Sequence, residues 1–202
     1  MVINRIGIMG GTFDPIHFGH LAIAEAAREE FNLRQVLFIP ANIPPHKRER
    51  NIICAAKRLT MVKLATADNE YFEVSDIELK RPGLSYTVDT LTELKCGQYT
   101  DAEFYFIIGT DSAEEFATWH EPEQILAKCH IIVTSRPGTE FKAEHLAAEL
   151  GEKVYEKIHC LTTPQLEISS TDIRRRLREG KSVRYLLPEA VRKFIYREGL
   201  YK

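Results

Sequence analysis

The chain has 202 residues, of which 44% are hydrophobic and 28% are charged, and its formal net charge is −2. A chain of this length and composition can bury a hydrophobic core without disulfides or structural metals. The near balance of charges excludes binding to nucleic acid or to an anionic membrane by bulk attraction, although it leaves room for a local basic patch.

The four cysteines are widely spaced, and no two of them form a C-x-x-C pair; they are Cys54, Cys96, Cys129 and Cys160. This spacing does not match a secreted disulfide framework or a zinc site. We therefore expect reduced thiols, most of them buried.

The start of the chain does not match a secretory signal peptide, because Arg5 interrupts the first apolar run. No apolar stretch approaches the ~20 residues that a membrane helix needs. We expect a cytoplasmic protein without membrane contact.

Short apolar runs that favour strands alternate with segments of helical spacing along the chain. The predicted order is strand 3–9, helix 18–31, strand 35–39, helix 53–67, strand 72–75, helix 86–95, strands 104–108, 129–134 and 158–161, and helices 170–179 and 188–198. Pro188 suits the first turn of the last helix, where a missing N–H costs nothing.

This alternation predicts an α/β fold that is Rossmann-like and doubly wound, with a mainly parallel sheet flanked by helices. We expect one domain, residues 1–202, whose residues from about 165 to 202 form a small C-terminal helical portion. Ligands of such sheets bind at the carboxyl ends of the strands, near the switch in strand order. Residues 40–51 form the one long irregular loop, and loops of this length are often functional.

The first candidate motif follows the first strand and reads G-G-T-F-D-P-I-H-F-G-H over residues 10–20. Gly10 and Gly11 allow the backbone to approach a ligand closely. The helix that follows directs N–H groups and a partial positive charge to the same place, which suits a phosphate. The motif is neither the dinucleotide fingerprint nor a P-loop.

Two histidines strengthen this motif. His17 and His20 lie three residues apart near a helix start, so they share a face and could both contact phosphate oxygens. Gly19, between them, would leave room for the ligand. A capping turn that only packs and a pair of metal ligands are the alternatives.

The second candidate motif reads I-S-S-T-D-I-R over residues 168–174. Ser169 or Ser170 fits the N-cap of a helix. Hydroxyls, free backbone N–H groups and Arg174 would then converge on an anion. The alternative is an ordinary capped helix with a basic face, because three more arginines follow by residue 178.

Together these motifs resemble the T/H-x-G-H and I-S-S-T-x-I-R signatures of the nucleotidyltransferase superfamily. The resemblance runs over essentially the whole chain and is closest to the bacterial nicotinate-nucleotide adenylyltransferase family. Further strings similar to that family are P-H-K at 45–47, S-Y-T-V-D-T-L at 85–91, G-T-D at 109–111 followed by Trp119, and S-R-P-G at 135–138. One departure is Thr110, where the family commonly has alanine; it matters little if the backbone makes the contact.

The resemblance implies a single nucleotidyltransferase domain that transfers the adenylyl group of ATP to nicotinate mononucleotide. The products would be nicotinate adenine dinucleotide and pyrophosphate, in a step of NAD biosynthesis, without a covalent enzyme intermediate. A phosphate monoester is already a nucleophile, so the protein must mainly align two anions and neutralise charge. Mg²⁺ should enter on ATP without dedicated protein ligands, because it keeps its waters.

The resemblance also implies three overlapping sets of site residues. The catalytic set is His17, His20, Lys47 and Arg174. The ATP-binding set is Gly10, Gly11, Thr12, Phe13, His17, His20, Ile168, Ser169, Ser170, Thr171 and Arg174. The mononucleotide-binding set is Gly10, Asp14, His46, Lys47, Tyr86, Thr87, Gly109, Asp111, Trp119 and Arg136.

Several of these residues have structural alternatives. Trp119 would stack on the pyridine ring or pack in the core. Thr87, with the backbone of Tyr86 or Trp119, could hydrogen-bond the nicotinate carboxylate. Asp111 could accept from ribose hydroxyls or cap a helix, and Arg136 could line the site or form a structural pair.

Other functions stay open at this point. A relative of the same fold could act on nicotinamide mononucleotide or pantetheine phosphate, although the pantetheine enzyme usually lacks the strings at 45–47 and 85–91. A nucleic-acid-binding module is disfavoured by the weakly acidic chain, and a sensor that binds nucleotide without reacting is disfavoured by the retained histidine pair. We therefore expect ATP and nicotinate mononucleotide as partners and no nucleic acid. A homo-oligomer stays open.

Overall fold

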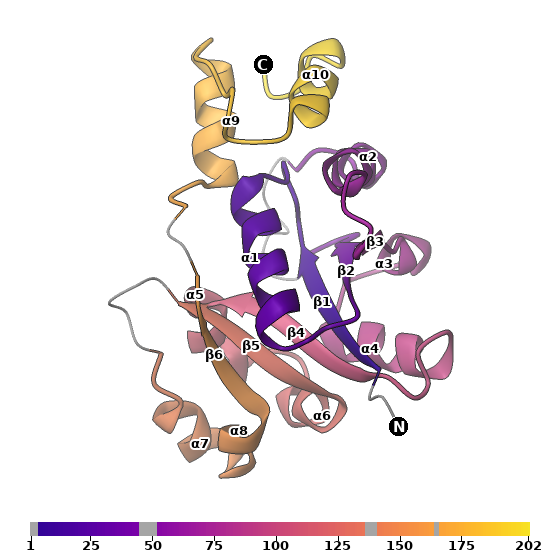
Figure 1. Ribbon diagram of the computed structural model, residues 1–202, viewed down its shortest axis with the longest axis vertical. Coiled ribbons are helices and arrows are strands. Elements are labelled where there is room, and N and C mark those ends of the chain that lie inside the picture. Colours follow the sequence, from indigo (N-terminus) through magenta and orange to yellow (C-terminus); the bar gives the residue numbers. More distant parts are fainter. Residues whose placement is uncertain (1–3, 45–51, 136–140, 164–165) are drawn as a thin grey trace.

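The computed structural model describes residues 4–44, 52–135, 141–163 and 166–202. A six-stranded sheet lies at its centre, with all neighbouring strands parallel and the order β3-β2-β1-β4-β5-β6 (Figure 1). The strands are β1 Arg5–Gly11, β2 Gln35–Pro40, β3 Phe72–Val74, β4 Glu103–Gly109, β5 Cys129–Ser135 and β6 Ile158–Thr162. The strand order reverses between β1 and β4, which is where ligands bind in doubly wound sheets.

Helices cover both faces of this sheet, which explains why the central strands are apolar on both faces. The α-helices are α1 Phe18–Glu30, α2 Ala55–Thr66, α3 Ile77–Lys80, α4 Thr87–Cys96, α5 Thr110–Glu114, α6 Pro122–Lys128, α7 Glu144–Leu150, α8 Lys153–Lys157, α9 Ser170–Arg178 and α10 Glu189–Arg197, with a 3₁₀-helix η2 at Phe116–Thr118. Helices α1, α2, α9 and α10 contribute to one core layer, and helices α4 to α8 contribute to the other.

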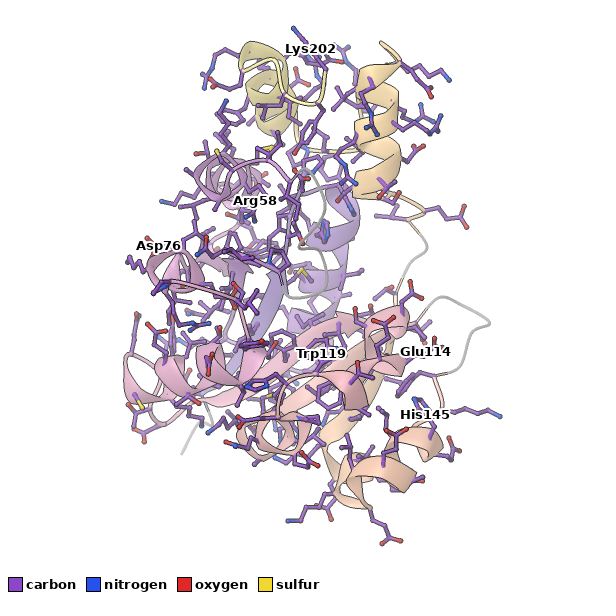
Figure 2. All side chains as sticks on the ribbon, turned by 180° about the vertical axis from the view of Figure 1, so that it is seen from behind. Arg58, Asp76, Glu114, Trp119, His145 and Lys202 are labelled. Atoms are coloured by element: carbon purple, nitrogen blue, oxygen red, sulfur yellow. The ribbon has the colours of Figure 1, made fainter. Side chains whose placement is uncertain are left out.

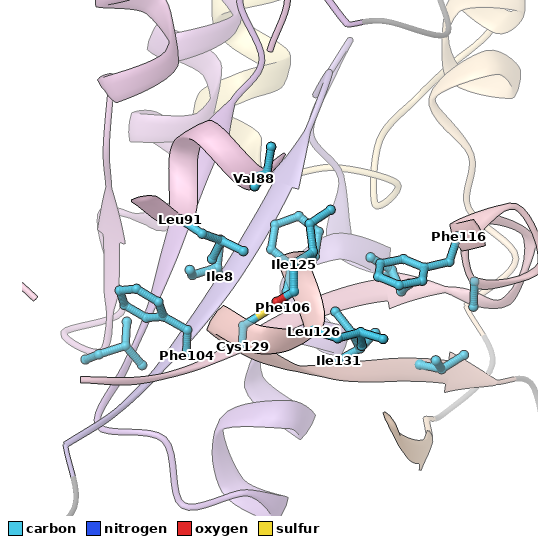
Figure 3. Close-up of a cluster of buried hydrophobic side chains, with 14 of the residues drawn as sticks. Ile8, Val88, Leu91, Phe104, Phe106, Phe116, Ile125, Leu126, Cys129 and Ile131 are labelled. Carbon is cyan, nitrogen blue, oxygen red and sulfur yellow. Dashed lines mark hydrogen bonds between the residues drawn. The ribbon is translucent and has the colours of Figure 1, made fainter. Parts of the chain in front are cut away.

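The two faces of β1 separate two hydrophobic clusters. Ile8 points to the cluster that includes Leu91, Phe104 and Ile131 (Figure 3). Met9 points to the opposite cluster, together with residues of α1 and α2. This division follows from the alternation of side chains along a strand.

The C-terminal helices share the second cluster with the first part of the chain. Ile173 of α9 and Val191 of α10 are fully buried in it beside Phe13 and Ile16, which belong to the turn after β1. Figure 1 shows α9 and α10 together beyond the carboxyl end of β1, close to α2. The C-terminal portion therefore packs against the end of the sheet where a ligand would bind.

The predicted α/β fold with its parallel sheet is confirmed, and every predicted strand and helix is present with shifts of at most two residues at its ends. The prediction missed α3, α5, α6, α7, α8 and η2, which have three to seven residues and are too short to show a helical period. Pro188 is the N-cap of α10 and so directly precedes the first turn in which it was predicted.

The expectation that most cysteines are buried is wrong. All four are free thiols, but Cys54, Cys96 and Cys160 are exposed and only Cys129 is buried. The exposed cysteines lie at the start of α2, at the end of α4 and on the edge strand β6, where little packs over them. Burial raises the pKa of the Cys129 thiol to about 12.

Within the part of the chain that the structure describes, every helix is too short or too polar to cross a bilayer.

Candidate active site

A cavity of about 1070 Å³ opens at the carboxyl ends of β1 and β4. The turn after β1, the starts of α1, α4, α5 and α9, and the end of β5 all contribute to its lining. Its position is the switch point of the sheet, and its size suits a nucleotide-sized ligand.

Most of the predicted site residues line this single cavity. From the two motifs, these are Gly10, Gly11, Thr12, Phe13, Asp14, His17, His20, Ile168, Ser169, Ser170, Thr171 and Arg174. From the rest of the predicted mononucleotide-binding set, Thr87, Gly109, Asp111 and Trp119 line it. Tyr86 does not belong to the lining, and His46, Lys47 and Arg136 lie outside the described residues.

Gly10 and Gly11 line the cavity, and the structure adds a packing reason for glycine at both positions. A Cβ on Gly10 would lie 3.1 Å from Cζ of Phe106, and one on Gly11 would lie 3.3 Å from Cζ of Phe13. These glycines make room for aromatic rings. The space beside Gly109 is open, because no heavy atom of the described residues comes within 4 Å of a Cβ built there.

The two histidines lie face against face at the start of α1. Their ring centroids are 3.8 Å apart, and His17 is the N-cap residue of the helix. The backbone N–H of His17 donates to Nδ1 of His20 at 3.2 Å. Since Nδ1 of His20 accepts, the proton of a neutral His20 ring is on Nε2, where it can be donated to an anion.

Burial controls the charge of His17. The side chain is buried, and its Nδ1 has no hydrogen-bond partner among the described residues. Burial lowers the pKa of His17 from 6.5 to about 4, so the free site holds a neutral ring at neutral pH. A Cβ on Gly19 would lie 3.0 Å from this Nδ1, so Gly19 makes room for the imidazole as well as lining the cavity.

The second motif is joined directly to the first. Ser170 Oγ donates to the carbonyl of Pro15 at 2.8 Å, and Arg174 Nη1 donates to the carbonyl of Asp14 at 2.7 Å. Arg174 Nη2 also donates to Thr171 Oγ1 at 3.2 Å. The start of α9 is thereby held against the turn that follows β1, and both can present donors to the same anion.

The serine hydroxyls of this motif already have structural partners. Ser169 is the N-cap of α9, and its Oγ accepts from the N–H of Asp172 at 3.1 Å. Because Ser170 Oγ donates to Pro15 whereas Ser169 Oγ only accepts from Asp172, the donors that a phosphate could use here include the Ser169 O–H and backbone N–H groups of the first turn of α9.

Trp119 combines the two roles that the sequence left open. It packs edge-on against Phe106, with ring centroids 6.1 Å apart, and lies 5.3 Å from the ring of Phe116. It is also half-buried and lines the cavity, close to the labelled Glu114 in Figure 2. A planar ligand ring could therefore meet a tryptophan that is already fixed by the core.

The backbone N–H groups of Tyr86 and Trp119, which were candidate donors to a carboxylate, already donate within the protein. The N–H of Trp119 donates to the carbonyl of Phe116 at 3.0 Å, and the N–H of Tyr86 donates to the carbonyl of Leu84 at 3.2 Å. Thr87 is the first residue of α4, so its N–H has no partner within the helix. Thr87 is the better donor for a carboxylate.

Asp111 lies in the first turn of α5 and is exposed toward the cavity mouth. Gly109 is the N-cap of this helix, so Asp111 does not take the capping role that was its alternative. Its carboxylate stays available to a hydroxyl of a ligand.

Arg58 does not line the cavity but supports the turn after β1, a role that the sequence did not reveal. It is 1% exposed, and its guanidinium donates to the carbonyls of Ile53 at 2.8 Å, Thr12 at 2.8 Å and Asn42 at 3.1 Å. Arg58 belongs to α2, and Figure 2 labels its side chain. Burial lowers the pKa of Arg58 while the nearby Asp14 opposes that shift. It ties the turn after β1 to the segments on either side of residues 45–51.

Glu78 of α3 is a second residue that was missed. It is 8% exposed, lines the cavity, and accepts from Thr90 Oγ1 at 2.7 Å. Burial raises the pKa of this carboxyl, whereas hydrogen bonds from Thr90 and Ser85 oppose the shift. Its helix has four residues and offers no sequence pattern. Among the described residues, no three His, Cys, Asp or Glu side chains are grouped so as to hold a metal ion.

Comparison with known proteins identifies the class to which this fold and site belong. A model of the cytidylyltransferase-like family matches residues 8–176. The chain is 51% identical to a protein of Desulfitobacterium hafniense strain Y51 over 98% of its own length and 96% of that protein, and 47% identical to one of Moorella thermoacetica over 98% and 92%. Both relatives bear the name "probable nicotinate-nucleotide adenylyltransferase". The chain belongs to the cytidylyltransferase-like family and, within it, to the nicotinate-nucleotide adenylyltransferases.

Solved structures agree on the fold. A Plasmodium falciparum nicotinic acid mononucleotide adenylyltransferase in complex with NaAD superposes with a TM-score of 0.79 at 19% identity, covering 98% of this chain and 97% of that one. The same enzyme in complex with APC gives a TM-score of 0.76 at 18% identity.

Replacing Arg58 by methionine should destabilise the protein strongly. Methionine fills much of the space but leaves three carbonyls without their donor, and each buried unsatisfied group costs about 1–3 kcal/mol, so we expect a loss of about 3 kcal/mol or more. Urea unfolding measures it. Arg197→Met is the control, because that side chain is 72% exposed, and it should change stability by less than about 0.5 kcal/mol. Similar losses for the two variants would contradict the anchoring role of Arg58.

The charge of His17 should respond to ligand. Between pH 6.5 and about 4 the unfolded chain binds a proton at His17 that the folded chain does not, so this group makes the folded state less stable as pH falls through that range. A bound triphosphate should raise the pKa again, because it favours the imidazolium. NMR titration of the His17 ring with and without ATP measures this, with the exposed His145 as reference. A His17 titration that ATP does not move would contradict a phosphate contact.

Proposed function

We propose that this chain transfers the adenylyl group of ATP to the 5′-phosphate of nicotinate mononucleotide, forming nicotinate adenine dinucleotide and pyrophosphate in NAD biosynthesis. The observation that carries the proposal is the joining of both phosphate motifs, through Ser170 and Arg174, in the cavity that Thr87 and Trp119 also line. The names of relatives that match almost the whole chain support the same reaction.

The donors at the phosphate end of the cavity suit an electrostatic mechanism. Nε2–H of His20, the backbone N–H groups near Thr12 and the start of α9 would surround the phosphates of ATP. Arg174 would neutralise charge on the departing pyrophosphate. Lys47, which lies outside the described residues, would also contact a phosphate. No general base is needed, because the attacking phosphate is already ionised.

At the other substrate, the residues would fix the ring and the ribose. Trp119, held by Phe106 and Phe116, would stack on the pyridine ring. Thr87 would donate to the nicotinate carboxylate, and Asp111 would accept from ribose hydroxyls. This arrangement would bring the attacking phosphate toward the α-phosphorus, which is the main requirement of the reaction.

Mg²⁺ would enter on the triphosphate and supply additional charge neutralisation there. Most groups at the phosphate end are imidazoles, hydroxyls, backbone N–H groups and a guanidinium, which bind anionic oxygens well and Mg²⁺ poorly, and the carboxylate of Asp14 there already accepts from Tyr201. The protein groups would therefore hold the phosphates and leave the ion to phosphate oxygens and water.

The acid form of the mononucleotide should be strongly preferred, because a helix-start N–H and hydroxyl at Thr87 favour a carboxylate over an amide. A pyrophosphate-release assay with ATP and each mononucleotide measures kcat/KM. Nicotinate should exceed nicotinamide mononucleotide by about tenfold or more, as expected for one charge-assisted contact. Equal values would refute the substrate assignment, and activity on pantetheine phosphate would redirect it.

Replacing His20 by alanine should lower kcat by about 100-fold or more, the effect of losing one preorganised donor to a transition-state oxygen. ATP binding, measured by calorimetry, should persist. The exposed His145→Ala is the matched control and should keep normal turnover. Near-normal turnover in the His20 variant would contradict its catalytic assignment.

A further inference from the structure

A tyrosine outside the predicted site contacts the phosphate turn. The hydroxyl of Tyr201 donates to Oδ1 of Asp14 at 2.6 Å, across a separation of 187 residues. Asp14 is 5% exposed and lines the cavity three residues before His17. A buried carboxylate needs such a donor, because an unsatisfied charge in this position is strongly unfavourable.

Among the described residues, Arg174 is the cation that forms an ion pair with this carboxylate, and the pair is long. Arg174 Nη1 donates to the backbone carbonyl of Asp14 at 2.7 Å but lies 3.9 Å from Oδ2 of the same residue. Nη2 of Arg174 contacts Thr171 Oγ1 at 3.2 Å. The short bond to the carboxylate thus comes from a neutral hydroxyl, although a guanidinium lies close by.

The other cation near Asp14 cannot move to it easily. Arg58 acts on Asp14 through space, but its guanidinium is fixed by three backbone carbonyls. Arg174, by contrast, lies on the surface of the cavity, with 23% of its side chain exposed. If the hydroxyl of Tyr201 were absent, Arg174 would be the group free to satisfy the carboxylate.

Such a rearrangement would affect ATP specifically. A bond between a guanidinium and a carboxylate is about twice as strong as a neutral hydrogen bond, and a movement of about an ångström would form it. A guanidinium paired with the Asp14 carboxylate would attract a phosphate much less strongly, because the negative charge beside it offsets its own.

We propose that Tyr201 is a positioning residue for ATP: by satisfying the Asp14 carboxylate, it keeps Arg174 available to the triphosphate. The proposal rests on the proposed function, in which Arg174 contacts the phosphates of ATP. It assigns to the segment after α10 a role in the reaction that packing alone does not provide.

The test is Tyr201→Phe, which removes the hydroxyl and keeps the ring. We expect KM for ATP to rise about tenfold, as for the loss of one charge-assisted contact, and KM for the mononucleotide, whose predicted contacts include Asp14, to rise by a clearly smaller factor. The control is Tyr185→Phe, because Tyr185 is 82% exposed, and both of its KM values should be unchanged. A Tyr201 variant that raises both KM values equally, or neither, would overturn the proposal.

A double-mutant cycle separates this effect from a general loss of packing. Asp14→Asn removes the charge that would attract Arg174. In that background Tyr201→Phe should change KM for ATP by less than about twofold, because no carboxylate is left to capture the guanidinium. An undiminished effect in the Asp14→Asn background would show that Tyr201 acts through packing, which overturns the proposal.

Two further measurements keep the test decisive. If Tyr201→Phe does not fold, a crystal structure of the unaltered protein with a non-hydrolysable ATP analogue decides: Arg174 should contact a phosphate while Tyr201 still donates to Asp14. A direct hydrogen bond from the Arg174 guanidinium to the Asp14 carboxylate in that complex, in place of the present separation of 3.9 Å, would overturn the proposal. Calorimetric titration with ATP alone reports on Tyr201 even if the unaltered protein fails to use nicotinate mononucleotide, so failure of the proposed function is seen separately.

Discussion

Two hydrogen bonds make one site out of two distant parts of the chain. Ser170 and Arg174 each donate to a backbone carbonyl of the turn between β1 and α1, across 155 and 160 residues. Both acceptors are backbone carbonyls, so these hydrogen bonds do not use the side chains of Asp14 and Pro15. They join the start of α9 to the backbone of the turn. This joint holds the start of α9 beside the turn that carries His17 and His20, so both line one cavity.

A second joint acts from the opposite side. Arg58 binds the carbonyl of Thr12 in the same turn and the carbonyls of Ile53 and Asn42 beyond it. The turn is thus held from α9 on one side and from α2 on the other. Such bracing suits a site that works by alignment, because small displacements of reacting groups cost much of the rate.

The sequence predicted the sheet and most of the cavity lining, because strands, caps and glycine turns leave local patterns. It could not predict Arg58. Lys57 and Arg58 are consecutive basic residues of one helix, yet Lys57 pairs with Glu198 at the surface while Arg58 is buried. Tyr201 was missed for the same reason, since its partner is 187 residues away. The sequence also did not show that a Cβ on Gly10 or Gly19 would meet the rings of Phe106 or His17, because these contacts arise from the folded chain.

The parallel pairing of β1 has a consequence for synthesis on the ribosome. β1 lies between β2 and β4, and β4 begins only at Glu103, while the phosphate turn is completed only by Ser170 and Arg174. An emerging chain therefore has a glycine turn and both histidines long before it can bind nucleotide. Nucleotide therefore cannot stabilise folding intermediates that form before Ser170 and Arg174 have been made, and until then the sheet depends on its own packing.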